Sequence, residues 1–151
     1  MSSSLRVHDT RLKRKVPFEP REPGKIGMYV CGITVYDLCH VGHARFLVAF
    51  DVIARYLRHR GLAVKLVRNI TDVDDKIIRR AQKEGRSAAE VAETYIQAMQ
   101  EDFRALGLQT PDVEPRATLH IQEVIDVVSR RVSGAASQVE RDDRASAGKP
   151  A

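Results

Sequence analysis

The sequence has few cysteines and no segment suited to a membrane. Only Cys31 and Cys39 occur among the 151 residues, which is too few for a disulfide framework and fits a reducing compartment. The longest apolar stretch, residues 46–53, is interrupted by Asp51, whereas a membrane span needs roughly 20 apolar residues. Residues 1–16 lack the apolar core of a secretory signal. These absences predict a soluble, cytoplasmic protein.

The length and net charge of the chain restrict its possible architecture and function only loosely. A chain of 151 residues suffices for one domain with a hydrophobic core, and it is too short for a catalytic domain plus a large second module. The net charge of +5 and the pI near 9.5 suit contact with an anion such as a nucleotide or an RNA backbone. A modest excess of Lys and Arg also occurs on ordinary soluble proteins, so charge alone selects no function.

The first third of the chain predicts a strand, a helix and a strand. Residues 27–31 have the composition of a short buried strand that follows a Glu-Pro-Gly turn. From about His43 to His59 the apolar residues recur with helical spacing, and residues 63–70 are rich in β-branched side chains. The apolar positions expected to form one buried helix face are Phe46, Leu47, Phe50, Ile53, Tyr56 and Leu57. This order is the parallel crossover unit of an α/β fold.

Two further helices are marked by their end signals. Asp72, Asp74 and Asp75 crowd the expected first turn of one helix, where the helix dipole favours carboxylates, and Gly85 is placed to end it. The Ser-Ala-Ala-Glu sequence at 87–90 is a capping box that opens the next helix. The expected apolar face of that helix is Val91, Tyr95, Met99, Phe103 and Leu106.

The last part of the chain changes character. After a loop over residues 109–116, which holds two prolines, a fourth helix should begin near Thr118. Its apolar positions are Ile121, Val124, Ile125 and Val128. From Ser133 the sequence turns to Ser, Ala, Gly and alternating charges, a composition that buries too little surface to offset the entropy of ordering. We therefore expect disorder over residues 133–151.

A nucleotide-binding signal lies between the first strand and the first helix. Ligands of α/β folds bind outside the carboxyl ends of the strands, and a helix N-terminus there offers free N–H groups to phosphates. His40 and His43 flank Gly42, so their imidazoles can donate to phosphate oxygens while the glycine lets a flat base approach. Two histidines around a glycine are more often an ordinary turn. The hypothesis of nucleotide binding therefore depends on their position between a strand and a helix.

Five motifs together resemble those of cysteinyl-tRNA synthetases, which are class I aminoacyl-tRNA synthetases. The likeness runs from about Leu5 to Arg131. The motifs are MYVCGITVYD at 28–37, HVGHAR at 40–45, FDV at 50–52, RNITDVDDK at 68–76 and PRATLHI at 115–121. Members of this family activate cysteine with ATP, which Mg²⁺ accompanies, and attach it to tRNA(Cys).

The resemblance also implies a domain plan. Residues 1–107 would form the N-terminal half of a Rossmann-like class I synthetase nucleotide-binding domain. Residues 108–132 would begin the helical connective region, and residues 133–151 would be a disordered tail unlike the family.

The resemblance assigns roles in ATP binding. His40 and His43 match the two histidines of the family's HIGH motif, which implies that they are catalytic and that they bind ATP together with Gly42. Val41 stands where the family has isoleucine, which is a conservative departure.

The resemblance also assigns a pocket for cysteine. Cys31 matches a ligand of the zinc ion that binds the thiol of the substrate, and a soft thiolate suits zinc better than a hydroxyl does. Gly32, Thr34 and Thr71 match positions that line the cysteine pocket with Cys31. Thr71 has an alternative role, as the cap of a helix that begins at Asp72.

The resemblance ends near Arg131. No KMSKS-like string and no second Cys or His cluster follows it, so a four-ligand zinc site cannot close within these residues. We therefore expect a truncated form with little or no activity, either monomeric or prone to aggregation. Two other readings stay open: the related ATP-dependent cysteine ligase of mycothiol synthesis, and a non-catalytic module that binds nucleotide or tRNA.

Overall fold

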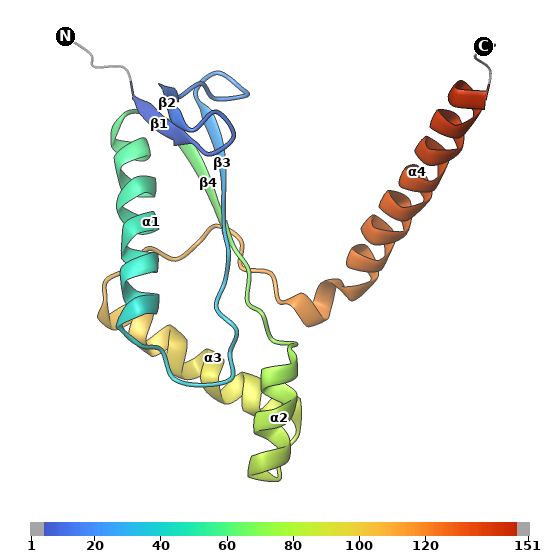
Figure 1. Cartoon of the computed structure of the whole chain (residues 1–151). Helices are drawn as coiled ribbons and strands as arrows, with labels where there is room; N and C mark the ends of the chain where they lie inside the picture. Colours follow the sequence, from blue (N-terminus) through green and yellow to red (C-terminus); the bar gives the residue numbers. More distant parts are fainter. Residues whose placement is uncertain (1–4, 148–151) are drawn as a thin grey trace.

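A parallel β-α-β unit forms the centre of the computed structural model (Figure 1). The structure describes the backbone of residues 5–147 and the side chains of residues 5–134. Strand β3 (Lys25–Val30) leads through helix α1 (Val41–His59) to strand β4 (Ala63–Arg68). The two strands are parallel, with Lys25 opposite Ala63 and Val30 opposite Arg68. The predicted crossover unit is confirmed.

Helix α1 covers one face of this small sheet (Figure 1). Val30 and Leu66 are buried there in a cluster with Ala54 of α1, and Phe50 packs against that cluster. The buried face of α1 is narrower than the sequence predicted. Leu47, Ala54 and Leu57 are buried, whereas Phe46, Ile53 and Tyr56 are exposed. On the opposite face of the sheet, Tyr29 is 63% exposed.

The loop predicted at residues 109–116 adds a third extended line to the sheet. Isolated parallel bridges join Val67 to Val113 and Ile70 to Arg116. The Asp112 carboxylate accepts a hydrogen bond from the Leu66 N–H at 2.6 Å. This segment therefore follows β4 along the edge away from β3.

Helices α2 (Asp75–Glu84) and α3 (Ala88–Ala105) form a hairpin with defined ends. The Asp74 carboxylate accepts from the Lys76 N–H at 2.8 Å, and Gly85 ends α2 at a φ of 65°, a left-handed conformation that glycine adopts without strain. Ser87 and Glu90 form the predicted capping box of α3. On the predicted face of α3, Val91, Tyr95, Met99 and Phe103 are buried, while Leu106 is exposed.

Asp72 does not lie in the first turn of α2, so that prediction is wrong. Its side chain is buried, and its two oxygens accept from the N–H and the hydroxyl of Thr118 at 2.9 and 2.6 Å. Because Asp74 caps α2, the alternative role of Thr71 as that cap is also wrong. The pairing of Asp72 with a residue 46 positions away replaced the local role that spacing suggested.

The main core lies below the sheet, between α2, α3 and the first half of α1 (Figure 1). Its buried side chains are Ile33, Val35, Leu47, Ile70, Ile77, Ala81, Val91, Ala92, Tyr95, Ile96, Met99 and Phe103. This core fixes the segment that follows β3 against α2 and α3. It therefore positions the strand-to-helix connection in which the predicted site lies.

An antiparallel hairpin, which the sequence analysis did not predict, precedes the central unit. Strands β1 (Arg6–Asp9) and β2 (Arg14–Pro17) pair with each other and not with the β3–β4 sheet. In the turn between them, Asp9 accepts from the Leu12 N–H at 2.7 Å, and Lys13 adopts a φ of 52°.

The fourth helix begins close to the predicted position. A 3₁₀ turn, η1 (Ala117–His120), leads into α4 (Ile121–Ala147), which extends away from the rest of the molecule (Figure 1). Its predicted apolar positions, Ile121, Val124, Ile125 and Val128, are exposed. Within residues 5–147 no helix has the length and apolar character needed to cross a membrane.

Helix α4 continues to Ala147, through most of the segment expected to be disordered, and the disorder of residues 133–151 stays a prediction. The expectation rested on how little surface this composition can bury. Helix formation depends also on backbone propensity. Ala, Arg, Glu and Gln, which are good helix formers, are frequent after Ser133, and no proline occurs between Ser133 and Pro150. Residues 148–151 of the expected tail lie outside the described residues.

Candidate active site

His40 and His43 cap the N-terminus of α1 with their own imidazoles. His40 is the N-cap residue, and its Nδ1 accepts from the Gly42 N–H at 3.1 Å. In return, Nδ1 of His43 accepts from the His40 N–H at 3.2 Å. A neutral imidazole whose Nδ1 accepts a hydrogen bond carries its proton on Nε2. Each ring therefore keeps one N–H donor that the cap does not use.

The imidazole rings of His40 and His43 also contact each other directly. They are stacked, with centroids 3.9 Å apart and planes inclined by 19°. Burial, and then the proximity of His40, lower the pKa of His43 below its usual value of 6.5. His43 therefore stays neutral at pH 7, with its donor intact.

Gly42 is required by this cap. A Cβ at residue 42 would lie 2.8 Å from Cε1 and 3.0 Å from Nδ1 of His40, which is closer than side chains tolerate. A larger residue would displace the His40 ring from the N-cap. The approach of a flat base at Gly42 stays a prediction.

A cavity of about 300 Å³ opens beside His43, at the carboxyl end of β3. It brings together four residues predicted for the site: Cys31, Gly32, Thr34 and His43. The remaining lining residues are Ile33, Tyr36, Phe46 and Lys76. His40 lies on a neighbouring hollow of about 280 Å³ with Cys39 and Asp102.

Thr71 does not line the cavity, but its backbone holds the cavity wall. Its carbonyl accepts from the Val35 N–H, and its N–H donates to the Ile33 carbonyl, both at 3.2 Å. These two bonds flank Thr34, which forms a parallel bridge with Thr71.

Asn69 anchors the start of this wall and was not among the predicted site residues. Its Oδ1 accepts from the Gly32 N–H at 2.7 Å and from the Tyr29 hydroxyl at 2.9 Å. Its Nδ2 donates to Oγ1 of Thr71 at 3.1 Å. A Cβ on Gly32 would lie 1.5 Å from the Asn69 carbonyl oxygen, so glycine is required at residue 32 by this close backbone approach.

Lys76 is a second lining residue that the sequence analysis missed. It lies in the first turn of α2, and its Nζ is 5.2 Å from the centroid of the Tyr36 ring. A cation at a helix N-terminus opposes the helix dipole. That unfavourable placement is the signal in the sequence that could have identified Lys76 as a site residue.

The cysteines differ in environment. Cys31 is exposed and Cys39 is half-buried. Burial, and then the carboxylate of Asp102, raise the pKa of the Cys39 thiol, so Cys39 stays a protonated thiol. Among the described residues, no three His, Cys, Asp or Glu side chains form a group that could hold a metal ion.

Sequence comparison finds a matching family model and several similar proteins. The family described as "tRNA synthetases class I (C) catalytic domain" matches residues 17–147, and this range includes most of the segment expected to be unlike that family. A Cysteine--tRNA ligase of Bordetella parapertussis is 56% identical over 140 residues, which cover 92% of this chain and 29% of that protein. A Cysteine--tRNA ligase of Alkalilimnicola ehrlichii is 57% identical over 128 residues, which cover 85% and 28%. The chain thus spans less than a third of the curated relatives it matches.

Solved structures show the same fold. Mycobacterium tuberculosis methionyl-tRNA synthetase in complex with methionyl-adenylate matches 55% of this chain and 17% of its own, with 27% identity and a TM-score of 0.50. A LeuRS–tRNA–LeuAMS ternary complex from Agrobacterium radiobacter matches 75% of this chain and 15% of its own, with 23% identity and a TM-score of 0.60.

Proposed function

Because the chain belongs to the tRNA synthetases class I (C) catalytic domain family, we propose that it serves ATP-dependent activation of cysteine and its attachment to tRNA(Cys). The observation that supports this is the cavity at the carboxyl end of β3, where an imidazole and an ammonium group meet the lining residues Cys31 and Thr34. A cytoplasmic location follows from the proposal.

The histidines and Lys76 would act on the phosphates. The Nε2–H of His43 donates to a phosphate oxygen, and the stacked His40 ring keeps the His43 ring in place. The ammonium of Lys76 balances negative charge that develops as cysteine becomes an adenylate and pyrophosphate leaves. This is catalysis by positioning and electrostatics, and no protein nucleophile is needed.

The amino acid would bind at the other end of the cavity. Cys31, Gly32 and Thr34 line it, and Thr71 supports it through the backbone bonds to residues 33 and 35. The resemblance implies zinc at Cys31, but structural and catalytic zinc sites use three or four protein ligands. Since the described residues form no such group, they do not fit that ion, and no step is assigned to zinc or Mg²⁺.

Substitution of His43 separates its cap role from its donor role. The Oδ1 of an asparagine can take the place of Nδ1 in the cap, but asparagine has no group at the position of Nε2. We expect H43N to keep the unfolding free energy of the unsubstituted chain while its affinity for a sulfamoyl analogue of cysteinyl-adenylate falls about tenfold, the loss of one hydrogen bond to a charged group. Isothermal titration calorimetry measures that affinity.

Two further variants complete the experiment. H43Q can place a donor near Nε2, so it should bind the analogue better than H43N does, and its amide oxygen can still accept from the His40 N–H. H59N changes an exposed histidine at the far end of α1 and should alter neither quantity. Unchanged analogue affinity in a folded H43N variant would remove His43 from the proposed site.

A further inference from the structure

The β1–β2 hairpin concentrates positive charge. Over residues 5–17 it carries five cationic side chains against a single carboxylate, Asp9, while the whole chain has a net charge of +5. The five cationic residues are Arg6, Arg11, Lys13, Arg14 and Lys15, and all are exposed.

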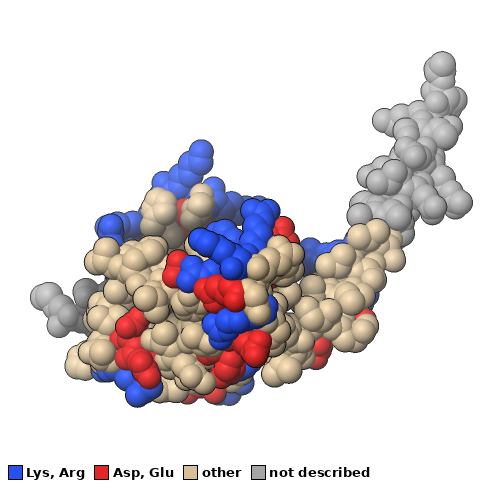
Figure 2. All heavy atoms as spheres, turned by 90° about the horizontal axis from the view of Figure 1, so that it is seen from below, with Lys and Arg blue, Asp and Glu red and all other residues tan. Residues whose placement is uncertain are grey.

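Elsewhere among the described residues, six arginine side chains pair with carboxylates. On the face formed by α2 and α3, Figure 2 shows Lys and Arg interspersed with Asp and Glu. The ion pairs of the body include Arg55–Asp51, Arg58–Asp112, Arg68–Glu114, Arg80–Glu84, Arg86–Glu84 and Arg116–Glu93. Among the described side chains, none of the five hairpin cations pairs with a carboxylate, and Arg6 donates instead to the Lys15 carbonyl at 3.0 Å. The charge of the hairpin is therefore not compensated within the described residues.

The register spreads these charges over the hairpin. His8 lies opposite Lys15, and Asp9 lies opposite Arg14. Because residues directly opposite each other share a face, Arg6 and Lys15 lie on one face and Arg14 on the other, with the remaining two cations in the turn. Like charges this close repel each other, so a bound polyanion would relieve a cost that the free hairpin carries.

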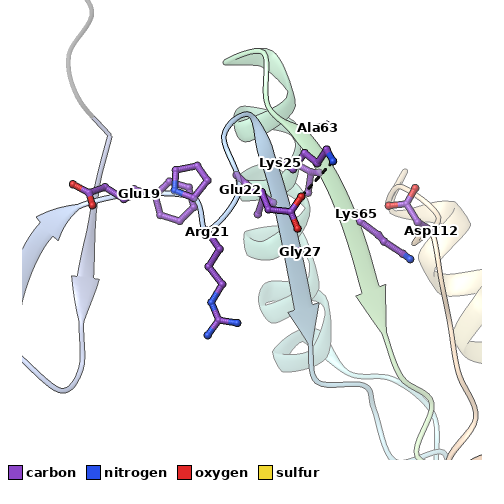
Figure 3. Close-up of a pocket in the computed structure, with 12 residues that line it drawn as sticks. Glu19, Arg21, Glu22, Lys25, Gly27, Ala63, Lys65 and Asp112 are labelled. Carbon is purple, nitrogen blue, oxygen red and sulfur yellow. Dashed lines mark hydrogen bonds and ion pairs between the residues drawn. The ribbon is translucent and has the colours of Figure 1, made fainter.

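Two further exposed cations, Arg21 and Lys65, lie near the hairpin. A hollow of about 850 Å³ lies between residues 18–22 and the open face of the sheet, and it is lined by Arg21 and Lys65 (Figure 3). Neither of these two cations has a carboxylate partner among the described side chains. Two of the three acidic residues that line the hollow are engaged: Glu22 pairs with Lys25 at 3.3 Å, and Asp112 pairs with Arg58 at 3.2 Å. The third, Glu19, lies close to Arg21 in the chain and offsets part of its charge.

The hairpin is remote from the candidate active site. It lies at the amino end of β3 and the C-terminal end of α1, whereas the cavity lies at the opposite ends of both elements (Figure 1). The 19 residues of α1 span about 28 Å at 1.5 Å per residue. A polyanion on the hairpin is therefore not the nucleotide in the cavity.

We propose that the β1–β2 hairpin, together with Arg21 and Lys65, is a contact surface for the phosphate backbone of RNA. Exposed Lys and Arg suit phosphates, whereas bases of single strands are bound by stacking on aromatic rings. The hairpin, residues 5–17, contains no Phe, Tyr or Trp, and Phe18 is the aromatic residue that lines the neighbouring hollow. The choice of RNA as the polyanion rests on the proposed function. Binding at this surface is independent of base sequence and weakens steeply with salt.

The test is the salt dependence of RNA binding. Fluorescence anisotropy measures the affinity of the chain for a labelled tRNA transcript over a range of salt concentrations. In the triple variant R11Q/R14Q/K15Q we expect affinity at low salt to fall about tenfold or more. The slope of log affinity against log salt should become shallower by about 2 to 3, close to one per lost phosphate contact. Circular dichroism confirms that the variant is folded.

The matched control, R79Q/K83Q/R104Q, removes the same charge from exposed positions on α2 and α3. It should leave the slope within about half a unit of that of the unsubstituted chain. Equal losses in the two variants would show that only net charge matters and would overturn the proposal. Tighter binding to vesicles containing anionic phosphatidylglycerol than to RNA would also overturn it.

The outcome is separable from that of the proposed function. The hairpin variant should bind the adenylate analogue as the unsubstituted chain does, and H43N should keep the full salt slope with RNA. If the chain fails to bind the analogue but shows the hairpin-dependent slope, the proposed function fails and the RNA surface stands. The reverse result rejects the RNA surface alone.

Discussion

Replacement of Gly32 by alanine should be among the most destabilising single-methyl changes in this chain. The added Cβ would lie 1.5 Å from the carbonyl oxygen and 2.5 Å from the carbonyl carbon of Asn69, whereas ordinary contact begins at 3.4 Å. A Cβ has no rotamer that avoids the clash, so the backbones that follow β3 and β4 must move apart by about 2 Å.

The cost follows from the bonds that this separation breaks. The Gly32 N–H donates to Oδ1 of Asn69 at 2.7 Å, and Thr71 makes two backbone bonds to residues 33 and 35 at 3.2 Å. Three bonds at about 1 kcal/mol each give a loss of about 3 kcal/mol. That loss is a large share of the roughly 5 to 15 kcal/mol by which domains are stable.

Urea unfolding followed by circular dichroism measures the loss, and Gly27 supplies the control. Gly27 lies within β3, and a Cβ added there meets no atom within 4 Å. Because glycine weakens a strand, G27A should be neutral or stabilise the chain by up to about 1 kcal/mol. A G32A variant within about 0.5 kcal/mol of the unsubstituted chain would refute this reasoning, since such a change is typical of ordinary surface substitutions.

Three other predictions follow from single side chains. T118V removes the hydroxyl that donates to the buried Asp72 carboxylate at 2.6 Å, so urea unfolding should show a loss of about 1.5 to 3 kcal/mol, and no loss would contradict the bond. In the folded chain the pKa of His43 lies below its usual value of 6.5. As the pH falls, His43 therefore becomes protonated in the unfolded chain at a higher pH than in the folded chain. Stability should be full above pH 6.5 and fall as pH drops through the lowered pKa, with a weaker dependence in H43N when unfolding is measured over a pH series. K76Q should weaken binding of the adenylate analogue about tenfold, because a charged contact is lost. Calorimetry measures that binding, and unchanged affinity would place Lys76 outside the site.

The parts of the fold that the sequence predicted are those whose signals lie within a few residues. The capping box of Ser87 and Glu90 and the left-handed Gly85 each concern one turn of chain. The parallel crossover follows from the order of three adjacent elements. Each of these depends on local backbone chemistry, which a sequence displays directly.

The parts that the sequence analysis missed depend on distant partners or on weak turn signals. Asp72 bonds to Thr118, which is 46 residues away, and no spacing rule connects the two. The β1–β2 hairpin turns at residues 10–13 without glycine or asparagine, and Lys13 takes the positive φ instead.

The candidate site divides in the same way. The position of His40, Gly42 and His43 at a strand-to-helix junction was predicted, and the structure confirms that they open α1. The use of both Nδ1 atoms as caps was not predicted, because histidine seldom serves as an N-cap and only geometry reveals it. Thr71 supports the wall through its backbone, which side-chain chemistry alone does not indicate.

The segment at residues 112–116 has a consequence for the order in which the chain folds. Its bridges and the bond from Leu66 to Asp112 join positions 46 residues apart, and closing so long a loop is entropically costly. Helices α2 and α3 lie within that loop and carry their own caps, so they can form early and shorten the distance to be closed. We expect a change such as S87A, which weakens the α3 cap, to slow the pairing of this sheet edge in refolding kinetics, although Ser87 makes no contact with the edge itself.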